Sequence, residues 1–428
     1  MSDQIIGFAG MTHLGINYLA AAAERGFKVV GFDQDPKIID CLKEGNLPIN
    51  EPHLPELINK NIEKISFTFQ IQKLLVCDVV YISMDVPTND AGQSNLSIVT
   101  KLINDVSRYL KTTSILVILC QVSPGFTRAL KFPLDRLFYQ VETLVFGTAV
   151  ERALCPERFI VGCVNNDKKL PFNYLQFLEK FGAPILQMCY ESAELAKIAI
   201  NCCLVASINV ANTLSEICEK IGADWSEIIP ALKLDKRIGQ FAYLSPGLGL
   251  SGGNLERDLN TVLELSNNYG TDTSVVSAWI KNSHYRKDWV LRMLHQELLN
   301  KHINPNIAIL GLAYKENTHS TKNSPALALL SNLKYFNRVK IYDPVVLLGM
   351  FPQELEVYFV ESLEDAIKDV DAVVIMTPWP QFKNLSFSIL KQHMRGRLII
   401  DPYKVIDNFE KNNKEFTYLT LGKDKIIC

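Results

Sequence analysis

The fold of this chain is constrained most by an alternation of short apolar runs with amphipathic stretches, which occurs twice along the sequence. Between residue 4 and about residue 189 the apolar runs are IIGFAG, KVVGFD, CDVVYISM, TSILVILC and ERFIVG; after residue 302 they are IAILGLAY, RVKIYD, VDAVVIMTP and GRLIID. Strands that alternate with helices form parallel sheets with helices on both faces. The sequence therefore predicts an α/β protein with two parallel-sheet regions.

These two regions are separated by a stretch from Ser192 to about Lys301 that has long helical patterns and no strand pattern. A chain of 428 residues with 48% hydrophobic content is long enough to build several cores. We therefore expect three domains: an N-terminal domain at 1–191, a central helical domain at 192–301 and a C-terminal domain at 302–428.

The composition excludes several classes of partner. A formal net charge of −2 gives no electrostatic reason to bind nucleic acid or an anionic membrane, so small molecules are the expected partners. The N-terminus lacks a signal-peptide pattern and no uninterrupted apolar segment spans a bilayer, which predicts a cytoplasmic protein. The ten cysteines include no C-x-x-C spacing, so we expect reduced thiols and no metal site.

The first strand, turn, helix and second strand resemble a dinucleotide-binding unit, IIGFAGMTHLGINYLAAAAERGFKVVGFD. In the Rossmann pattern G-x-G-x-x-G, the glycines let the backbone close on a pyrophosphate at the helix N-terminus. Gly10 and Gly15 are the first and third glycines of the pattern. Met11 follows Gly10, and Thr12 replaces the middle glycine. The Thr12 Cβ would hold the phosphates off, or its hydroxyl would supply a hydrogen bond. Asp33 closes the second strand, where a carboxylate binds a ribose hydroxyl and favours NAD over NADP; the alternative is a unit that binds no nucleotide.

Four turn-rich segments follow predicted strands: GNLPINEPHLPELI, DVPTNDAGQSNLS, QVSPGFTR and GLAYKENTHSTKNSPA. Loops at the ends of parallel strands line the ligand crevice of such sheets. Taken in chain order, the segments resemble the UDP-glucose/GDP-mannose dehydrogenase family over essentially the whole chain, and those that carry the resemblance are GNLPINEPHLPEL, VPTND, AELAKIAIN, IGQFAYLSPGLGLSGGNLERD, GLAYKENTHSTKNSPA, IYDP and MTPWPQF.

This resemblance implies an N-terminal Rossmann domain that binds NAD, a central helical domain used for homodimerisation, and a C-terminal Rossmann-like domain that binds the UDP half of a nucleotide sugar. Members of the family oxidise a sugar C6 alcohol to a carboxylate by two successive hydride transfers. The resemblance places the cofactor at the residues of the glycine turn and at Thr88, Gln121, Arg257 and Lys322. It places the substrate at Glu142, Tyr243, Gly247, Gly249 and Lys315.

The second oxidation in the family needs a cysteine thiol, which captures the aldehyde and forms a thioester. The family loop G-G-S-C-x-P-K-D is here SGGNLERD, with Asn254 at the cysteine and Arg257 at the lysine. A neutral carboxamide is not a useful nucleophile. Gln121 replaces a family threonine, Phe146 replaces the second of two glutamates, and Lys322 stands for an arginine.

Other family positions are retained. Lys197 and Asn201 are spaced i and i+4 in AELAKIAIN, so both side chains leave one face of a helix. They match the catalytic lysine and asparagine of the family, and Asp258 after the glycine-rich loop also matches. The alternatives are a surface lysine whose stem covers apolar neighbours, and a helix N-cap role for Asp258.

Three functional hypotheses follow. The leading one is an NAD-dependent oxidoreductase limited to two-electron alcohol/carbonyl chemistry on a nucleotide sugar, with Lys197 and Asn201 as its catalytic pair. The second is an inactive protein that binds NAD or a UDP-sugar. The third is an intact UDP-sugar 6-dehydrogenase that uses another nucleophile, for which Cys120, Cys202 and Cys203 are the candidates.

Overall fold

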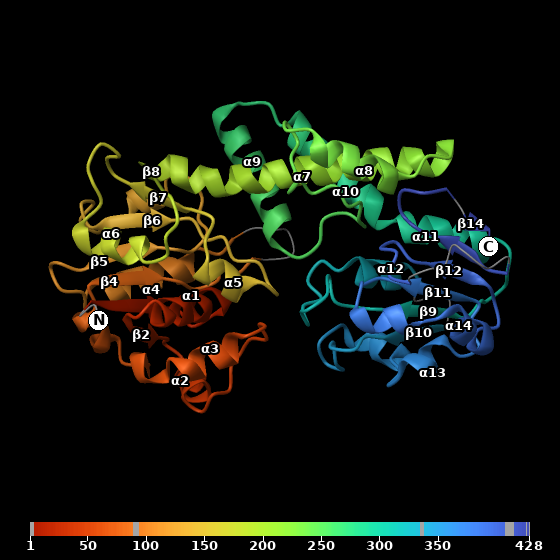
Figure 1. The fold of residues 1–428 in the computed structure, drawn as a ribbon, viewed down its shortest axis with the longest axis horizontal. Coiled ribbons are helices and arrows are strands. Elements are labelled where there is room, and N and C mark those ends of the chain that lie inside the picture. The colour runs from red at the N-terminus through yellow and green to blue at the C-terminus, as the bar shows by residue number, and fades with distance from the viewer. Residues whose placement is uncertain (1–3, 89–93, 334–337, 407–414, 425, 428) are drawn as a thin grey trace. The chain divides into compact units, whose positions relative to one another are not determined.

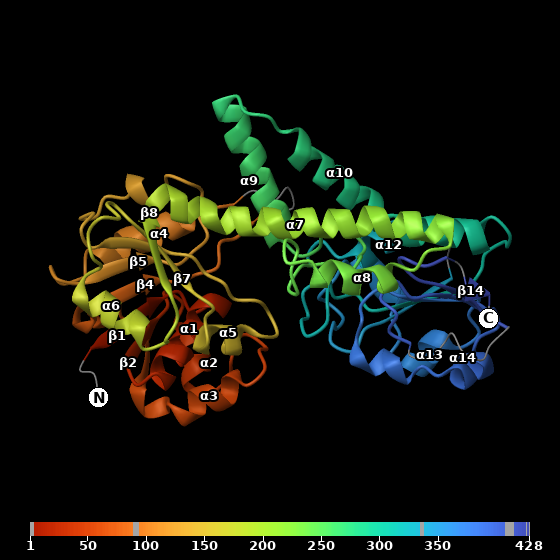
Figure 2. The ribbon, with the colours of Figure 1, turned by 45° about the horizontal axis from the view of Figure 1, so that its top comes forward.

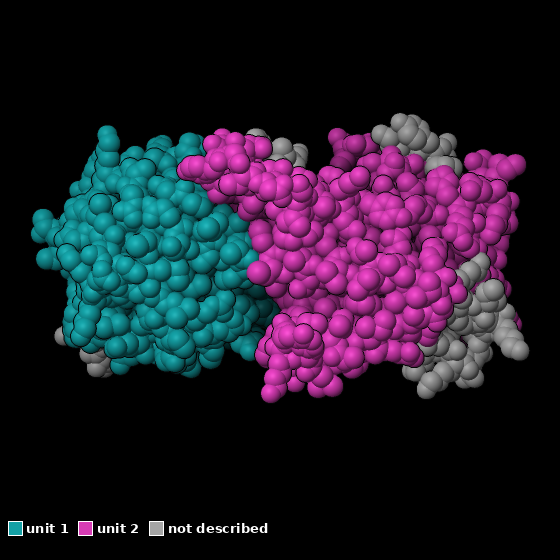
Figure 3. Space-filling model, turned by 90° about the horizontal axis from the view of Figure 1, so that it is seen from above, with its two compact units in different colours: residues 1–200 teal, residues 201–428 magenta. Residues whose placement is uncertain are grey.

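The computed structural model describes residues 4–88, 94–333, 338–406, 415–424 and 426–427. The chain divides into two compact units, residues 1–200 and 201–428 (Figure 3). Each unit contains its own sheet, and each is an α/β structure, which confirms the predicted fold class. The finer division into three domains at 191/192 and 301/302 stays a prediction.

The first unit is built on an eight-stranded sheet in the order β3-β2-β1-β4-β5-β6-β7-β8 (Figure 1). All neighbouring strands are parallel except β6 and β7. The strands are β1 (Ile5–Ala9), β2 (Lys28–Phe32), β3 (Ile65–Thr68), β4 (Val79–Ile82), β5 (Ile115–Ile118), β6 (Leu137–Gln140), β7 (Phe159–Cys163) and β8 (Ile185–Cys189). The helices are α1 (His13–Glu24), α2 (Pro36–Lys43), α3 (Leu54–Lys60), α4 (Ser97–Ser107), α5 (Ala149–Leu154) and α6 (Phe172–Glu179).

Side chains of this sheet pack into two separate hydrophobic cores, one on each face. On β4, Val79 and Tyr81 belong to the core that includes residues of α1 and α6, whereas Val80 and Ile82 belong to the core that includes residues of α4. This division follows from the two-residue period of a strand. A central strand of a doubly covered sheet must therefore be apolar at every position, which is why VVYI reads as a continuous apolar run.

The long helix α7 (Tyr190–Ile221) contains residues of both units. By length and composition it is apolar enough to cross a membrane, whereas the sequence predicted no segment of this kind. Its polar side chains Glu194, Asn212 and Ser215 are almost completely buried. Buried polar groups with protein partners are typical of the core helix of a globular protein rather than of a lipid-facing helix.

The second unit combines helices, several of which are labelled in Figure 2, with a smaller sheet in the order β10-β9-β11-β12-β13-β14, parallel except for β13 and β14. Its helices are α8 (Trp225–Leu234), α9 (Asn254–Tyr269), α10 (Ser274–Lys287), α11 (Trp289–Leu294), α12 (Pro325–Leu333), α13 (Leu363–Ile367) and α14 (Phe387–His393). The strands are β9 (Ile307–Leu310), β10 (Val339–Tyr342), β11 (Ala372–Ile375), β12 (Leu398–Ile400), β13 (Thr417–Leu419) and β14 (Ile426–Ile427). All nine apolar runs singled out in the sequence contain a strand, as predicted.

Candidate functional site

The turn between β1 and α1 requires glycine at two positions. Gly10 has φ +102°, and a Cβ there would lie 2.6 Å from the Cβ of Met84. At Gly15 a Cβ would lie 1.9 Å from the carbonyl oxygen of Gly10. Only glycine lets α1 approach the strand this closely. Both glycines of the predicted dinucleotide turn are thus explained by local geometry.

Asp33 directly follows β2 and is hydrogen-bonded to the turn between β1 and α1. Its Oδ2 accepts from the Met11 N–H at 2.8 Å, and its Oδ1 accepts from the Asp35 N–H at 3.0 Å. A carboxylate has about four lone-pair positions, so each oxygen can still accept from a ribose hydroxyl. A fixed carboxylate beside a close glycine turn fits the adenosine half of NAD, and its charge opposes a 2′-phosphate.

Thr12 is the N-cap residue of α1, at the position of the missing middle glycine. Its hydroxyl accepts from the Asp85 N–H at 2.9 Å and donates to the Ser83 carbonyl at 3.3 Å. The hydroxyl therefore ties the turn to the loop after β4. Because the hydroxyl donates its one proton to Ser83, it has no proton left for a phosphate in this arrangement, and the role of the Cβ stays a prediction.

His13, Glu51 and Asp85 surround the same helix end, and none of them was predicted as a site residue from the sequence. The His13 Nε2 lies 3.0 Å from Oε2 of the buried Glu51, and the His13 ring stacks on Phe146 with centroids 3.8 Å apart. Glu51 also accepts from the N–H groups of Gly147 and Ala149, at 3.1 and 2.8 Å.

Desolvation raises the pKa of Asp85, while attraction to His13 and hydrogen bonds from Thr12 and the His13 backbone oppose the rise. This carboxyl group lies at the N-terminus of α1, which favours anions. Two features of the sequence could have pointed to these residues. His13 lies inside the glycine pattern, and Glu51 lies inside GNLPINEPHLPELI.

Other predicted residues of the first unit follow the carboxyl ends of parallel strands. Gln121 lies buried three residues after β5, and Glu142 lies two residues after β6. Thr88, in the loop after β4, forms an isolated bridge with Ser94. Because β4, β5 and β6 are parallel, these residues share one edge of the sheet with the turn after β1.

Lys197 on α7 forms an ion pair with Glu142. Its Nζ lies 2.9 Å from Oε1 of Glu142 and donates to the Glu142 carbonyl oxygen at 3.1 Å. The two side chains are only 12% and 14% exposed. The alternative of a surface lysine on a solvated helix face is therefore wrong. The Leu144 N–H donates to the other carboxylate oxygen, at 3.1 Å, which fixes the glutamate in place.

One turn along α7, Asn201 belongs to a second buried polar group. Its Nδ2 donates to Oδ2 of Asp258, whose Oδ1 lies 3.6 Å from Nε of Arg257. All three residues are at most 6% exposed. The N-cap residue of α9 is Gly253, five positions before Asp258, so the helix-cap explanation of Asp258 is wrong.

Asn254 is the first residue of α9, and its side chain is exposed. The glycine-rich loop before it contacts the segment after β9. The Gly252 N–H donates to the Lys322 carbonyl at 3.2 Å, and a Cβ on Gly253 would lie 3.3 Å from Nζ of Lys322. Nothing larger than glycine fits there without moving that side chain.

The segment after β9 supplies two further contacts. The ring of Tyr314 lies against Gly252, where a Cβ would approach it to 3.2 Å. Nζ of Lys315 lies 5.9 Å from the centroid of the same ring. Lys315 and Lys322 therefore lie on one segment that packs on the loop before Asn254, although their roles in binding stay predictions.

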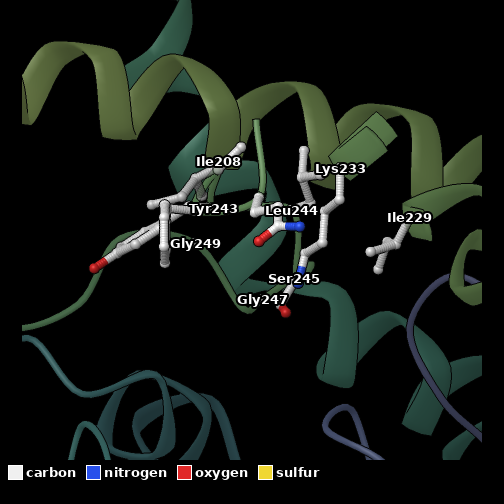
Figure 4. A pocket seen from close by; sticks show the side chains of 11 residues that line it. Ile208, Ile229, Lys233, Tyr243, Leu244, Ser245, Gly247 and Gly249 are labelled. Atoms are coloured by element: carbon white, nitrogen blue, oxygen red, sulfur yellow. The ribbon is translucent and has the colours of Figure 1, made fainter. Parts of the chain in front are cut away.

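Tyr243, Gly247 and Gly249 line one cavity of about 460 Å³ in the second unit (Figure 4). The sequence predicted them as a substrate-binding group, and the structure brings them together. Gly249 has φ +79° and a Cβ there would lie 2.4 Å from a backbone oxygen. Lys233 of α8, not singled out from the sequence, adds a cation to the lining.

Two of the three candidate replacement thiols are poorly reactive. Burial raises the pKa of Cys120 to about 12, and its thiol donates to the Ile82 carbonyl. Burial, assisted by the Asp258 carboxylate, raises the pKa of Cys202 to about 11. Since the thiolate is the nucleophile, neither group is activated near neutral pH. Cys203 is exposed on the same helix.

Comparison with known proteins assigns all three parts of the chain. Residues 4–175 match the NAD binding domain of the UDP-glucose/GDP-mannose dehydrogenase family, residues 191–284 its central domain, and residues 308–408 its UDP binding domain. A UDP-glucose 6-dehydrogenase of Rickettsia conorii is 30% identical over 441 residues, covering 97% of this chain and 99% of the relative. UDP-glucose 6-dehydrogenase TuaD of Bacillus subtilis is 27% identical, covering 98% and 94%.

Solved structures agree on the fold. A UDP-D-ManNAc dehydrogenase from Pyrococcus horikoshii superposes with a TM-score of 0.84 at 23% identity, covering 98% of this chain and 99% of that chain. A UDP-glucose dehydrogenase from Pyrobaculum islandicum gives a TM-score of 0.83 at 24% identity, covering 98% and 97%.

Proposed function

Because the chain belongs to the UDP-glucose/GDP-mannose dehydrogenase family and uses NAD, we propose that it performs only the first half of the family's reaction. It transfers one hydride from an alcohol carbon of a UDP-sugar to NAD and releases the carbonyl product. The observation that carries this proposal is Asn254, a residue without nucleophilic chemistry, at the position of the family's cysteine.

The second oxidation fails for a chemical reason. In the family's route the aldehyde first adds a thiolate, and the resulting thiohemiacetal loses the second hydride. The Asn254 carboxamide does not add to an aldehyde, and the raised pKa values of Cys120 and Cys202 keep both thiols protonated. Gln121 and Phe146 replace further groups of the family site, which is consistent with a site that no longer forms or hydrolyses a thioester.

The first oxidation needs a proton acceptor and a hydride acceptor. Bound NAD supplies the hydride acceptor. We assign the hydroxyl proton to the Lys197 and Glu142 pair, whose Nζ and Oε1 lie 2.9 Å apart: the pair accepts this proton as the hydride leaves for NAD, with Lys197 as the group that contacts the substrate. Asn201, fixed by Asp258, orients the substrate as a hydrogen-bond donor or acceptor. Asp33 and the glycine turn hold the adenosine end of the cofactor.

The protein also acts as a homodimer in this proposal. Four exposed apolar side chains of α7 recur at i, i+4, i+7 and i+11, and they are Val210, Leu214, Ile217 and Ile221. This spacing places them on one helix face, which a second copy can cover. Light scattering on the purified protein tests the assembly, with Ile217→Glu as a disrupting variant and Lys220→Glu, which adds a carboxylate to the same helix without removing an apolar side chain, as its control.

The reaction is tested by counting NADH. Limiting UDP-sugars are incubated with excess NAD, and the carbonyl product is trapped with hydroxylamine. One NADH per sugar together with a trapped carbonyl supports the proposal. Two NADH per sugar and a carboxylate product overturn it and favour an intact 6-dehydrogenase with another nucleophile. Binding of NAD and UDP-sugar by calorimetry with no NADH formed favours an inactive binding protein, which the joint changes at Thr12, Gln121, Phe146 and Asn254 also fit.

A further inference from the structure

Another cavity lies in the first unit, at the end of its sheet opposite the dinucleotide turn. Its volume is about 370 Å³, and it is lined by two segments, which comprise Asn104, Ser107, Arg108, Leu110, Lys111 and Thr112, and then Lys131, Phe132, Pro133 and Arg136. The first segment leads into β5 and the second into β6. The cavity therefore lies at the amino ends of these parallel strands, whereas the turn at Gly10 follows the carboxyl end of β1.

The lining of this cavity is strongly basic. It contains four cationic side chains and no carboxylate. Lys111 forms an ion pair with Asp78 at 2.8 Å, outside the lining. Arg108 and Lys131 are exposed and form no ion pair with any residue that the structure describes. Asp105 and Asp135 lie close by in sequence, but neither lines the cavity. Cations gathered around one concave surface repel each other until an anion binds.

Stabilisation of a helix end explains only part of this charge. Arg108 is the C-cap residue of α4, and Lys111 follows it, so both cations lie where the helix dipole favours positive charge. Lys131 and Arg136 come from a separate segment that precedes β6, where only the single-turn 3-10 helix Thr127–Ala129 ends and no α-helix does. Their contribution to the same cavity requires another explanation, and an anionic ligand supplies one.

One of the cations is held in a fixed orientation. The Arg136 guanidinium donates to the Ser114 carbonyl at 2.9 Å and lies over the Phe132 ring at 5.1 Å. A planar guanidinium fixed in this way presents its remaining N–H groups in a fork that suits phosphate oxygens. Leu110, Phe132 and Pro133 form an apolar part of the lining, beside the charges. Charge and apolar surface together suit a phosphate attached to a ring.

We propose that this cavity is a second ligand site, which binds a small phosphorylated molecule whose ring packs against Phe132. The volume of the cavity lies within the range of small-molecule sites. Its surface is concave, unlike a surface that binds a flat membrane. The site is independent of the proposed reaction, because its lining shares no residue with the dinucleotide turn or with the Lys197 and Glu142 pair.

Calorimetry on the full chain tests the proposal, with phenyl phosphate and inorganic phosphate as probes at 0.15 M salt. The test variant is Arg108→Glu combined with Lys131→Glu, both at exposed positions. The matched control is Lys101→Glu combined with Lys169→Glu, which makes the same change in net charge at exposed positions outside the cavity. We expect one equivalent of phenyl phosphate to bind, at least tenfold more weakly to the test variant and within twofold of wild type to the control.

Hydrogen exchange locates the binding. Protection of residues 104–112 and 131–136 on addition of phenyl phosphate supports the site, whereas protection confined to residues 10–16 places the phosphate at the dinucleotide turn and overturns the proposal. Absence of binding to the wild type, or equal binding to wild type and test variant, overturns it as well. If phenyl phosphate binds no tighter than inorganic phosphate, the apolar lining at Leu110, Phe132 and Pro133 does not contact the ring, and that part of the proposal is wrong. None of these results alters the NADH count, so the two proposals fail separately.

Discussion

Replacing Thr12 separates the two effects of a side chain at the missing glycine. The Thr12 hydroxyl makes hydrogen bonds of 2.9 Å and 3.3 Å with the Asp85 N–H and the Ser83 carbonyl. Each is worth about 1 kcal/mol, so Thr12→Ala should lower the free energy of unfolding of the first unit by about 2 kcal/mol. Thr12→Gly should lose about 0.5 kcal/mol more through chain entropy. Thr12→Ser keeps the hydroxyl and should lose much less.

The same variants should diverge in NAD affinity. Alanine keeps the Cβ at the position of the missing middle glycine, whereas glycine removes it, and we expect the phosphates then to reach the N–H groups of α1. One additional charge-assisted hydrogen bond, about 1.4 kcal/mol, corresponds to about tenfold tighter binding for Thr12→Gly alone. Thr12→Ala should bind NAD like the wild type.

Stability must be followed within the first unit. All four tryptophans, Trp225, Trp279, Trp289 and Trp379, lie in the second unit, so their fluorescence is an internal control. Amide hydrogen exchange in β1 and α1 reports the first unit, and calorimetry reports NAD affinity. Equal NAD affinity of the alanine and glycine variants would show that the Cβ does not obstruct the phosphates. An equal loss of stability in the serine and alanine variants would refute the role of the hydroxyl.

Three further predictions rest on single contacts. Gly15→Ala should lower the free energy of unfolding of the first unit by about 3 kcal/mol or more, because the added Cβ would lie 1.9 Å from a backbone oxygen. The control, Gly26→Ala, has φ +93° but no atom within 4 Å of its Cβ, and should lower it by only about 1 kcal/mol. Hydrogen exchange in α1 measures both changes. Lys197→Met should reduce NADH formation about 1000-fold with unchanged NAD affinity, and a variant that keeps a tenth of the rate would contradict its role as proton acceptor. Because its raised pKa of about 11 keeps Cys202 protonated, iodoacetamide should spare it at pH 7.5 and label it increasingly toward pH 11, while Cys120, with a pKa of about 12, stays unlabelled longer; mass spectrometry that finds rapid labelling at pH 7.5 would contradict this assignment.

Several strands of the structure were not predicted from the sequence. The nine strands recognised in the sequence are carried by continuous apolar runs, whereas β3 (ISFT), β6 (LFYQ) and β8 (ILQMC) were not recognised. They are no shorter than the recognised strands, but polar side chains interrupt each of them, so no continuous apolar run marks them. Missing β6 mattered, because this strand leads directly to Glu142 and places it at the edge of the sheet where the dinucleotide turn lies.

The sequence by itself determined the features that depend on a few neighbouring residues. They are the alternation that makes an α/β fold, the glycines of the turn after β1, and the absence of a thiol at position 254. Only the tertiary structure decided which polar groups meet. Lys197 meets Glu142 across 55 positions, and Asn201 meets Asp258 across 57. Backbone sterics and periodicity act over single turns and strands, whereas strand order and helix packing bring distant segments together, and no local pattern contains that information.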